Sequence, residues 1–444
     1  MEKTATRFFA SRGFREVSGI GGTYIPPSDK SITHRAIMLA SVAEGWCEVI
    51  NPLYTGDCLS TLGCVEALGI EIEKMERNDK RVLRILGKGL HGFKEPVGVL
   101  DAGNSGTTMR LLSGLLAGLP LYAVITGDSS LLRRPMSRVV SPLRSMGARI
   151  EGREGGRFAP LTFLPGDGLL EPIEYDLPIA SAQVKSAVLL AALRSKGIVV
   201  VKGLINSRDH TERLFKALDL PIEVEEEKII LQPVSEIPPF KVEVPGDISS
   251  AAFFIAGALL SGRELTVKNC GINPTRMGFV NVLKKMGASI EIVLEKEEMG
   301  EPVGTITVSP SNLRGVEIGK EEIPSLIDEI PLLVAVALFA DGKTVIRGAE
   351  DLKHKESNRL LTTKEMIEDL GGVVHLLEDG FIVEGPQDLK TGTIDCKGDH
   401  RIAMAGAILG SVVEGGVNIV GFEAAKVSYP SFVSDFIALG GAID

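Results

Sequence analysis

The sequence predicts an α/β protein of two domains, each built from three copies of one repeated unit. With 444 residues the chain is longer than one ordinary hydrophobic core serves, so two domains are expected. A helix that ends in Leu-Gly or Met-Gly and leads into a strand recurs along the chain. The residues that end successive copies of this helix are 78, 72, 68, 84 and 69 positions apart. A nearly all-apolar helix precedes each of these helices. Six such units divide naturally into two domains of three.

The residue that ends each of these helices is expected at the C′ position, where a positive φ is favourable. The six positions are Gly69, Gly147, Asp219, Gly287, Gly371 and Gly440. The helices that they end are amphipathic and should cover the outside of each domain, whereas the apolar helices, such as 251–260 and 332–339, should be buried. Short alternating strands are expected at 199–201, 265–267, 305–308, 343–346 and 417–420.

Composition restricts the classes of partner. The formal net charge of −10 argues against nucleic acid or a membrane surface, but a local cationic pocket can still bind an anionic small molecule. The five cysteines are scattered without a metal-binding spacing, which is typical of reduced thiols in a cytoplasmic protein. No apolar run approaches the ~20 residues of a membrane span. We interpret the first 16 residues as a short tail rather than a signal peptide, and we expect a cytoplasmic monomer.

The stretch 29–35, Asp-Lys-Ser-Ile-Thr-His-Arg, begins the first buried helix. Ser28 or Asp29 is a suitable N-cap, so the free N–H groups of the first turn should lie beside Lys30. Ser31 and Arg35 are four residues apart and share one helical face. A lysine, an arginine, a hydroxyl and a helix N-terminus in one small volume suit a dianionic ligand. Taken alone, the stretch fits a capped surface helix with solvated charges equally well.

The other five buried helices also begin with polar residues. Their starts contain Asn104, Ser105 and Gly106; Ser181, Gln183 and Lys185; Asp247, Ser249 and Ser250; Asp328 and Glu329; and Asp399, His400 and Arg401. Any one of these starts is explained by helix capping. Carboxylate, amide, lysine and arginine groups at all six helix starts indicate a binding site instead. The glycine-flanked turn at 101–110 matches no nucleotide-binding motif.

Charged clusters between the helices include 353–359, in which Glu356 is embedded among four basic residues. Solvated turns are the alternative explanation for such clusters. A carboxylate there should stay ionised unless it is buried, and it could carry a proton. The sequence has no nucleophile elbow and no metal-ligand set. These residues indicate an enzyme that binds more than one phosphate or carboxylate group and performs acid–base chemistry.

The chain resembles the 5-enolpyruvylshikimate-3-phosphate synthase family over roughly residues 17–440. The resemblance rests on the order and spacing of the stretches 29–35, 103–107, 134–135, 181–183, 246–250, 273–276, 355–359 and 399–401, together with Lys426. It implies two inside-out α/β domains, each of three βαβαββ repeats, with the active site in the interdomain cleft. The chain should cross between the domains near 26–29 and 243–246. The resulting domains comprise residues 1–27 with 243–444, and residues 28–242.

The resemblance implies transfer of the enolpyruvyl group of phosphoenolpyruvate to the 5-hydroxyl of shikimate 3-phosphate, with release of phosphate and without a metal or organic cofactor. It assigns the phosphoenolpyruvate site to Lys30, Asn104, Gly106, Arg134, Gln183, Arg359, Arg401 and Lys426. It assigns the shikimate 3-phosphate site to Ser31, Arg35, Ser181, Ala182, Gln183, Ser207, Asp328 and Lys355. Asp328 then acts as the base for the 5-hydroxyl. Glu356, with Lys30 and Lys426 nearby, gives a proton to the phosphoenolpyruvate methylene group.

Ala182 departs from the family pattern, because many members have a second phosphate-binding serine there. Our hypothesis is that Lys185, one helical turn beyond Ser181, compensates for the missing hydroxyl. The resemblance also links Gly106 to the entry of glyphosate into the phosphoenolpyruvate site. Ala182 and Lys185 follow a different subgroup of the family, so sensitivity to glyphosate stays open.

The nearest alternative is the UDP-N-acetylglucosamine enolpyruvyl transferase family, which has the same fold and chemistry and a reactive cysteine before an Arg-Pro pair. In this chain the loop 127–135 ends in Arg-Pro but contains no cysteine. A non-catalytic anion-binding repeat protein would keep the arginines but would not need both Asp328 and Glu356. An enzyme that processes phosphate ends of RNA on similar units is disfavoured by the acidic net charge.

Overall fold

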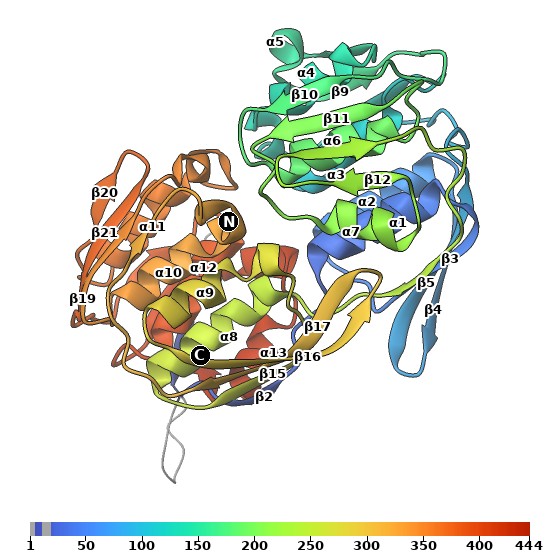
Figure 1. Ribbon diagram of the computed structural model, residues 1–444. Coiled ribbons are helices and arrows are strands. Elements are labelled where there is room, and N and C mark those ends of the chain that lie inside the picture. The colour runs from blue at the N-terminus through green and yellow to red at the C-terminus, as the bar shows by residue number, and fades with distance from the viewer. Residues whose placement is uncertain (1–4, 11–18) are drawn as a thin grey trace. The chain divides into compact units, whose positions relative to one another are not determined.

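The computed structural model describes residues 5–10 and 19–444 of the chain (Figure 1). The chain divides into two compact units, which we call unit 1 and unit 2. Unit 1 comprises the described residues up to Pro27 together with Gly246–Lys296 and Pro302–Asp444. Unit 2 comprises Ser28–Pro245 and the short segment Glu297–Glu301. This short segment lies within the part of the chain that otherwise forms unit 1, and the sequence pattern does not predict it.

Three four-stranded sheets are present in the described residues of unit 2. In spatial order, the strands of the first sheet are β14 (Lys241–Glu243), β3 (Glu44–Ile50), β5 (Lys80–Lys88) and β4 (Glu71–Arg77). Those of the second are β6 (Leu100–Asp101), β7 (Ala123–Thr126), β9 (Phe158–Phe163) and β8 (Ile150–Gly152). Those of the third are β10 (Glu174–Leu177), β11 (Val199–Gly203), β13 (Lys228–Leu231) and β12 (Ile222–Val224).

Unit 1 likewise holds three four-stranded sheets in its described part. In spatial order, the first consists of β2 (Gly22–Tyr24), β15 (Leu265–Gly271), β17 (Glu301–Ser309) and β16 (Ser289–Glu298). The second consists of β18 (Glu317–Ile318), β19 (Gly342–Ile346), β21 (Gly380–Gly385) and β20 (His375–Leu377). The third consists of β22 (Thr393–Asp395), β23 (Val417–Val420), β1 (Ala5–Ala10) and β24 (Gly441–Ile443).

All of these sheets share one arrangement, in which the first two strands are parallel and the third is antiparallel to the second. In three sheets one strand comes from a distant part of the sequence. These strands are β14, β2 and β1. The repeat that the sequence predicts is therefore confirmed, together with the α/β class, and sequence order alone does not reveal which strand completes a repeat.

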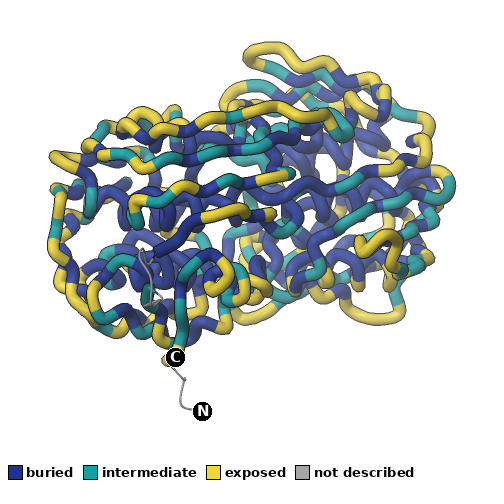
Figure 2. Tube along the Cα trace, turned by 90° about the horizontal axis from the view of Figure 1, so that it is seen from below, coloured by how far each residue is buried: buried dark blue, intermediate teal, exposed yellow. Residues whose placement is uncertain are grey.

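Each repeat contributes one apolar helix and one outer helix. The apolar helices are α1 (Lys30–Ser41), α3 (Gly106–Leu116), α6 (Ala182–Ala192), α8 (Ile248–Ser261), α10 (Ile330–Ala337) and α12 (His400–Gly410). The outer helices are α2 (Gly56–Ala67), α4 (Ser137–Ser145), α7 (His210–Ala217), α9 (Gly278–Lys285), α11 (Arg359–Glu368) and α13 (Phe432–Ala438). Every residue of α10 and α12 is buried, as expected for helices that are almost entirely apolar. Figure 2 shows the buried stretches, in dark blue, mostly inside the trace and the exposed ones, in yellow, mostly at its outer turns. Each unit has its own hydrophobic core around its apolar helices.

Short helices connect these elements. They are α5 (Arg153–Gly156) and the 3₁₀ helices η1 (Leu131–Arg133), η2 (Pro274–Arg276), η3 (Ile323–Ser325), η4 (Ile327–Glu329), η5 (Glu350–His354) and η6 (Phe422–Val427). No helix among the described residues combines the length and the apolar character that crossing a bilayer requires.

The predicted C′ positions are confirmed by their backbone angles. The φ values are 87° at Gly69, 92° at Gly147, 55° at Asp219, 98° at Gly287, 75° at Gly371 and 109° at Gly440. Asp219 adopts the left-handed conformation in the copy that lacks glycine, and aspartate is among the few other residues that do so readily.

The interpretation of the N-terminal residues as a tail is wrong for Ala5–Ala10. This segment forms β1, which pairs antiparallel with both β23 and β24 in the last sheet of unit 1. Phe8 on this strand is fully buried. The remainder of the expected tail lies outside the described residues. Local sequence does not reveal β1, because its pairing partners lie at the opposite end of the chain.

Candidate functional site

The N-terminus of α1 carries the first group of expected binding residues in unit 2. Of the two expected N-caps, Asp29 is the one that caps the helix, by accepting a hydrogen bond from the N–H of Ile32 at 2.8 Å. The Lys30 ammonium group lies 3.0 Å from a carboxylate oxygen of Asp57 on α2, and both side chains are only partly exposed. Asp57 therefore fixes Lys30 at the N-terminus of α1, where the helix dipole favours a negatively charged group.

Arg35 is buried one turn further along α1. Its Nε donates to the Thr211 hydroxyl at 2.8 Å, and its two terminal nitrogens donate to the Ser186 hydroxyl at 2.9 Å and to the carbonyl of Ser31 at 3.0 Å. Burial lowers the pKa of Arg35 to about 10, against the raising influence of nearby Glu212. Because these three hydrogen bonds go to neutral oxygens, the guanidinium group would gain from an anionic ligand.

The N-terminus of α3 forms a second group. The Ser105 hydroxyl caps this helix, and the preceding Asn104 accepts a hydrogen bond from Arg134 at 2.7 Å. A β-carbon on Gly106 would lie 2.9 Å from a terminal nitrogen of Arg110 and 3.4 Å from one of Arg134. The missing side chain at Gly106 thus allows two guanidinium groups to approach the start of α3.

Gln183 connects the start of α6 with this second group. Its side-chain oxygen accepts a hydrogen bond from Arg110 at 2.5 Å, and its side-chain nitrogen donates to the Thr107 hydroxyl at 3.0 Å. Four of the expected phosphoenolpyruvate residues are therefore brought together within unit 2. They are Asn104, Gly106, Arg134 and Gln183.

Three residues expected to bind shikimate 3-phosphate lie near two helix starts. Ser181 and Ala182 are at the start of α6, and Ser207 is in the loop before α7. Ser181 is the N-cap of α6 and Ala182 is its first residue. Ser207 is buried, and its N–H donates to the carbonyl of Ile205 at 2.7 Å. Lys185 joins the two elements that carry Ser181 and Ser207, because it belongs to α6 and donates to the carbonyl of Ser207 at 3.2 Å.

The hypothesis that Lys185 replaces a phosphate-binding serine is wrong. Lys185 is 1% exposed, and its ammonium group lies 2.6 Å from Glu212. It also donates to the carbonyl oxygens of Ile205 at 3.0 Å and Ser207 at 3.2 Å. An ammonium group has three N–H donors, and these partners use all of them. Lys185 instead holds the loop that carries Ser207 against α6.

Arg359, the first residue of α11, is the centre of the group in unit 1. Its guanidinium donates to Asp399 at 2.9 and 3.2 Å, to Glu356 at 2.6 Å and to Asp328 at 3.3 Å. Lys355 donates to the same oxygen of Asp328 at 3.2 Å. The two expected acid–base residues, Asp328 and Glu356, are therefore bound to one guanidinium group.

Arg359 and Asp399 each favour the charged form of the other. Burial alone would lower the pKa of Arg359, but Asp399, Glu356 and Asp328 outweigh burial and raise the pKa above its usual value. Burial would likewise raise the pKa of the Asp399 carboxyl, but Arg359 holds that pKa below its usual value. Arg359 consequently stays charged and reduces the repulsion among the carboxylates around it.

Arg401, near the start of α12, forms an ion pair with Glu329, a neighbour of Asp328. One terminal nitrogen lies 3.2 Å from a carboxylate oxygen of Glu329 and 3.4 Å from the carbonyl oxygen of Ser249. The Ser249 hydroxyl also donates to Glu329, and Arg276 donates to that hydroxyl at 2.5 Å. Asp328 and Glu329 are neighbours on η4, so two successive carboxylates hold two different arginines.

A family model described as EPSP synthase (3-phosphoshikimate 1-carboxyvinyltransferase) matches residues 15–436. This chain belongs to the EPSP synthase family. A 3-phosphoshikimate 1-carboxyvinyltransferase from Bacillus cytotoxicus is 46% identical over 426 residues, covering 96% of this chain and 99% of that relative. One from Bacillus cereus strain G9842 is 46% identical over 419 residues, covering 94% and 96%. The solved EPSP synthase from Acinetobacter baumannii is 37% identical and superimposes with a TM-score of 0.85, covering 99% of this chain and 100% of that one.

The residues expected from the EPSP synthase resemblance are distributed over both units. Those from Lys30 to Ser207 lie in unit 2, and those from Asp328 to Lys426 lie in unit 1. Lys426 is exposed on η6, so in the described chain it does not belong to the hydrogen-bonded group around Arg359.

Two residues next to the expected site residues receive no substrate-binding or catalytic role from the sequence, although Glu329 is among the polar residues expected at the buried helix starts. Arg110 touches Gln183 and borders Gly106, and Glu329 holds Arg401. The only sequence signal for either residue is its position within about one turn of a buried helix start. That signal does not separate them from ordinary capping or solvated residues.

Proposed function

We infer that this chain is a transferase that moves the enolpyruvyl group of phosphoenolpyruvate to the 5-hydroxyl of shikimate 3-phosphate and releases phosphate. The match to the EPSP synthase family over residues 15–436 carries this conclusion. The relatives named 3-phosphoshikimate 1-carboxyvinyltransferase support it along nearly the whole chain. The product belongs to the shikimate pathway, which leads to chorismate and the aromatic amino acids.

We propose that the groups in unit 2 bind both substrates. Phosphoenolpyruvate is assigned to Lys30, Asn104, Gly106, Arg134 and Gln183, and shikimate 3-phosphate to Ser31, Arg35, Ser181, Ala182, Gln183 and Ser207. The support is electrostatic: a lysine beside the start of α1 and two arginines beside the start of α3 suit phosphate and carboxylate groups. Arg35, a buried cation with neutral hydrogen-bond partners, suits the ring carboxylate.

We further propose that unit 1 supplies the acid and the base. The reaction protonates C3 of phosphoenolpyruvate, which gives C2 cationic character, and the 5-hydroxyl attacks C2. The resulting ketal then loses phosphate and a C3 proton. Glu356 delivers and later retrieves that proton, Asp328 accepts the proton of the 5-hydroxyl, and Lys30 and Lys426 assist. Arg359, Arg401 and Lys426 are assigned to phosphoenolpyruvate, and Asp328 and Lys355 to shikimate 3-phosphate.

The decisive experiment measures phosphate release from phosphoenolpyruvate with shikimate 3-phosphate and, in parallel, with UDP-N-acetylglucosamine, without added metal. We expect release with shikimate 3-phosphate alone. Release with the sugar nucleotide alone would overturn the assignment of the acceptor. Binding of shikimate 3-phosphate without release in either reaction would favour a non-catalytic anion-binding protein.

We also propose that the chain acts as a cytoplasmic monomer and needs neither a metal nor an organic cofactor. The net charge of −10 disfavours nucleic acid and membrane surfaces as partners. The five free cysteines agree with a reducing compartment. Light scattering coupled to gel filtration should give the mass of one chain, and a chelator should leave activity unchanged. A dimer mass, or activity that one metal restores after chelation, would contradict the proposal.

A further inference from the structure

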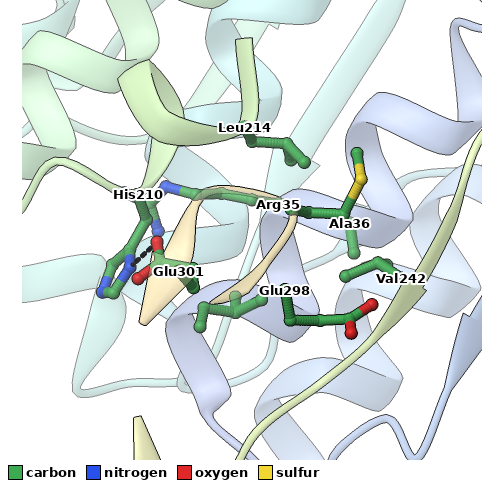
Figure 3. A pocket seen from close by; sticks show the side chains of 9 residues that line it. Arg35, Ala36, His210, Leu214, Val242, Glu298 and Glu301 are labelled. Carbon is green, nitrogen blue, oxygen red and sulfur yellow. Dashed lines mark hydrogen bonds and ion pairs between the residues drawn. The ribbon is translucent and has the colours of Figure 1, made fainter. Parts of the chain in front are cut away.

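The short segment of unit 2 at 297–301, which we call the hairpin tip, comprises the last two residues of β16, the turn at 299–300 and the first residue of β17. The Glu301 carboxylate lies 2.7 Å from Nδ1 of His210 on α7, and both side chains are at most 5% exposed (Figure 3). Arg213, one turn further along α7, donates to the carbonyl of Gly300 at 2.9 Å. The hairpin tip is therefore bound to the first turns of α7 by one buried pair and one additional hydrogen bond.

A second contact holds the hairpin tip without involving α7. The Glu298 carboxylate accepts a hydrogen bond from the backbone N–H of Glu243, on β14, at 3.0 Å. In Figure 3 the Glu298 side chain extends toward Val242, whereas Glu301 points toward His210. Two glutamates of one five-residue segment thus contact different elements, which provides a matched pair for mutagenesis.

The first turn of α7, which the hairpin tip holds, also contacts Arg35 and Lys185. His210 binds the hairpin tip, and the next residue, Thr211, accepts the hydrogen bond from Nε of Arg35 at 2.8 Å. The third residue, Glu212, forms the 2.6 Å ion pair with Lys185, which in turn holds the carbonyl of Ser207. Three successive side chains of α7 therefore connect the hairpin tip, Arg35 and the Ser207 loop.

The cavity in Figure 3 lies within this cluster, and its size excludes a substrate role. It is lined by Arg35, His210 and Glu301 together with apolar side chains such as Leu214 and Val242, and its volume is about 10 Å³. Such a space holds about one water molecule. The His210–Glu301 pair consequently acts through its neighbours and not by contacting a ligand in this cavity.

We propose that Glu301 and His210 are positioning residues for shikimate 3-phosphate: the hairpin tip fixes the first turn of α7, and α7 fixes Arg35 and Ser207. This inference rests on the proposed function, because it assumes that Arg35 and Ser207 bind that substrate. The guanidinium of Arg35 can adopt many rotamers, and the Thr211 hydroxyl is one of the three acceptors that together select the observed one. If the first turn of α7 moved, the Arg35 guanidinium would lose its fixed orientation, although no residue that contacts the substrate would have been removed.

The test compares Glu301→Gln with Glu298→Gln. The second variant is the matched control, because the Glu298 carboxylate belongs to the same hairpin tip but contacts β14. Glu301→Gln should raise the KM for shikimate 3-phosphate by about 3- to 30-fold, the usual range for a coupled positioning residue, and should leave the KM for phosphoenolpyruvate unchanged. Glu298→Gln should leave both KM values unchanged. Arg213→Ala, which removes a partly exposed contact to the hairpin tip, should change the same KM in the same direction by a smaller factor.

Amide hydrogen exchange gives a readout that does not depend on the reaction. In Glu301→Gln, the amides of residues 207–213 should exchange faster than in the wild type, while those of α3 should not change. If the wild type does not turn over shikimate 3-phosphate, the proposed function fails. The exchange measurement still shows in that case whether the hairpin tip stabilises the first turn of α7. Unchanged exchange, or equal increases of both KM values in Glu301→Gln and Arg213→Ala, would overturn the inference.

Discussion

His34 should reduce the stability of unit 2 in mild acid, and replacing it should remove that effect. The side chain is fully buried, its Nδ1 lies 2.7 Å from the Thr61 hydroxyl, and its Nε2 has no hydrogen-bond partner among the described residues. Burial, reinforced by the cations of Lys30 and Arg35, lowers the pKa of His34 well below its usual value. The folded chain therefore keeps this imidazole neutral at pH values at which an unfolded chain protonates it.

The magnitude follows from proton linkage. An unfolded histidine has a pKa of about 6.5, so below this pH the unfolded chain binds more protons than the folded chain, and stability falls as the pH falls. Between pH 7.5 and pH 5.5 the protonation of the unfolded histidine changes the unfolding equilibrium about tenfold, or about 1.4 kcal/mol. In His34→Gln this loss should be absent, because the amide takes up no proton in either state. The amide can still bond to the Thr61 hydroxyl.

Trp46 makes the measurement specific to unit 2, since it is the single tryptophan of the chain and lies on β3. Urea unfolding followed by Trp46 fluorescence gives the free energy of unfolding at pH 7.5 and at pH 5.5. We expect the decrease of this free energy between the two pH values to be about 1.4 kcal/mol smaller in His34→Gln than in the wild type. His375→Gln is the control, because His375 is exposed on β20 in unit 1. Equal losses in the wild type and in His34→Gln would refute the reasoning.

Three other predictions concern the ion pairs and the thiols. Glu356→Gln should lower kcat by about 10²–10⁴-fold, the usual size of a general acid–base contribution, with less effect on binding; unchanged turnover would exclude Glu356 from proton transfer. Glu329→Gln should raise the KM for phosphoenolpyruvate by about 3- to 30-fold, because a neutral amide holds the Arg401 guanidinium less firmly than a carboxylate; a wild-type KM would show that this ion pair is not needed. All five cysteines are buried, and burial raises the pKa of Cys64 to about 12, so a thiol reagent at neutral pH should label them slowly in the folded chain and completely after unfolding. Rapid labelling of the folded chain would contradict these buried positions.

The repeats were predictable because the signals that mark them are local. A residue with positive φ at the end of a helix depends on its own backbone and its nearest neighbours, so glycine at five C′ positions marks five helix ends. Even the exception at Asp219 keeps the spacing of the series. The polar starts of the buried helices are local in the same sense, and Asp29 caps α1 as its sequence position suggests.

The strand exchanges were not predictable, because they depend on pairing between distant segments. Ala5–Ala10 is a short mixed segment that becomes a central strand only between β23 and β24. Lys241–Glu243 similarly completes the sheet of β3. Strand propensity depends on such neighbours more than on the segment itself. The hairpin tip is a further case, since nothing in the acidic run around Glu297 indicates that one of its neighbours pairs with a buried histidine.

Burial likewise decided the role of Lys185. Its helical spacing from Ser181 suggested a phosphate contact, and the spacing itself is correct. The sequence does not show that Glu212 and two carbonyl groups from the loop before α7 occupy all three of its donors. A charged residue at a helix start is therefore a candidate for ligand binding only while its hydrogen-bonding capacity is not used by the protein.

Arg35 and Arg359 show how two buried arginines can serve different purposes. Burial lowers the pKa of Arg35 to about 10, whereas three carboxylates raise the pKa of Arg359 despite its burial. The hydrogen bonds of Arg35 go to two hydroxyl groups and one carbonyl, so its charge gains strongly from an anionic ligand. Arg359 instead donates hydrogen bonds to Asp328 and Glu356 and so fixes their positions relative to each other. The same side chain thus has neutral partners in unit 2, where an anionic ligand would stabilise its charge, and carboxylate partners in unit 1, which it holds together.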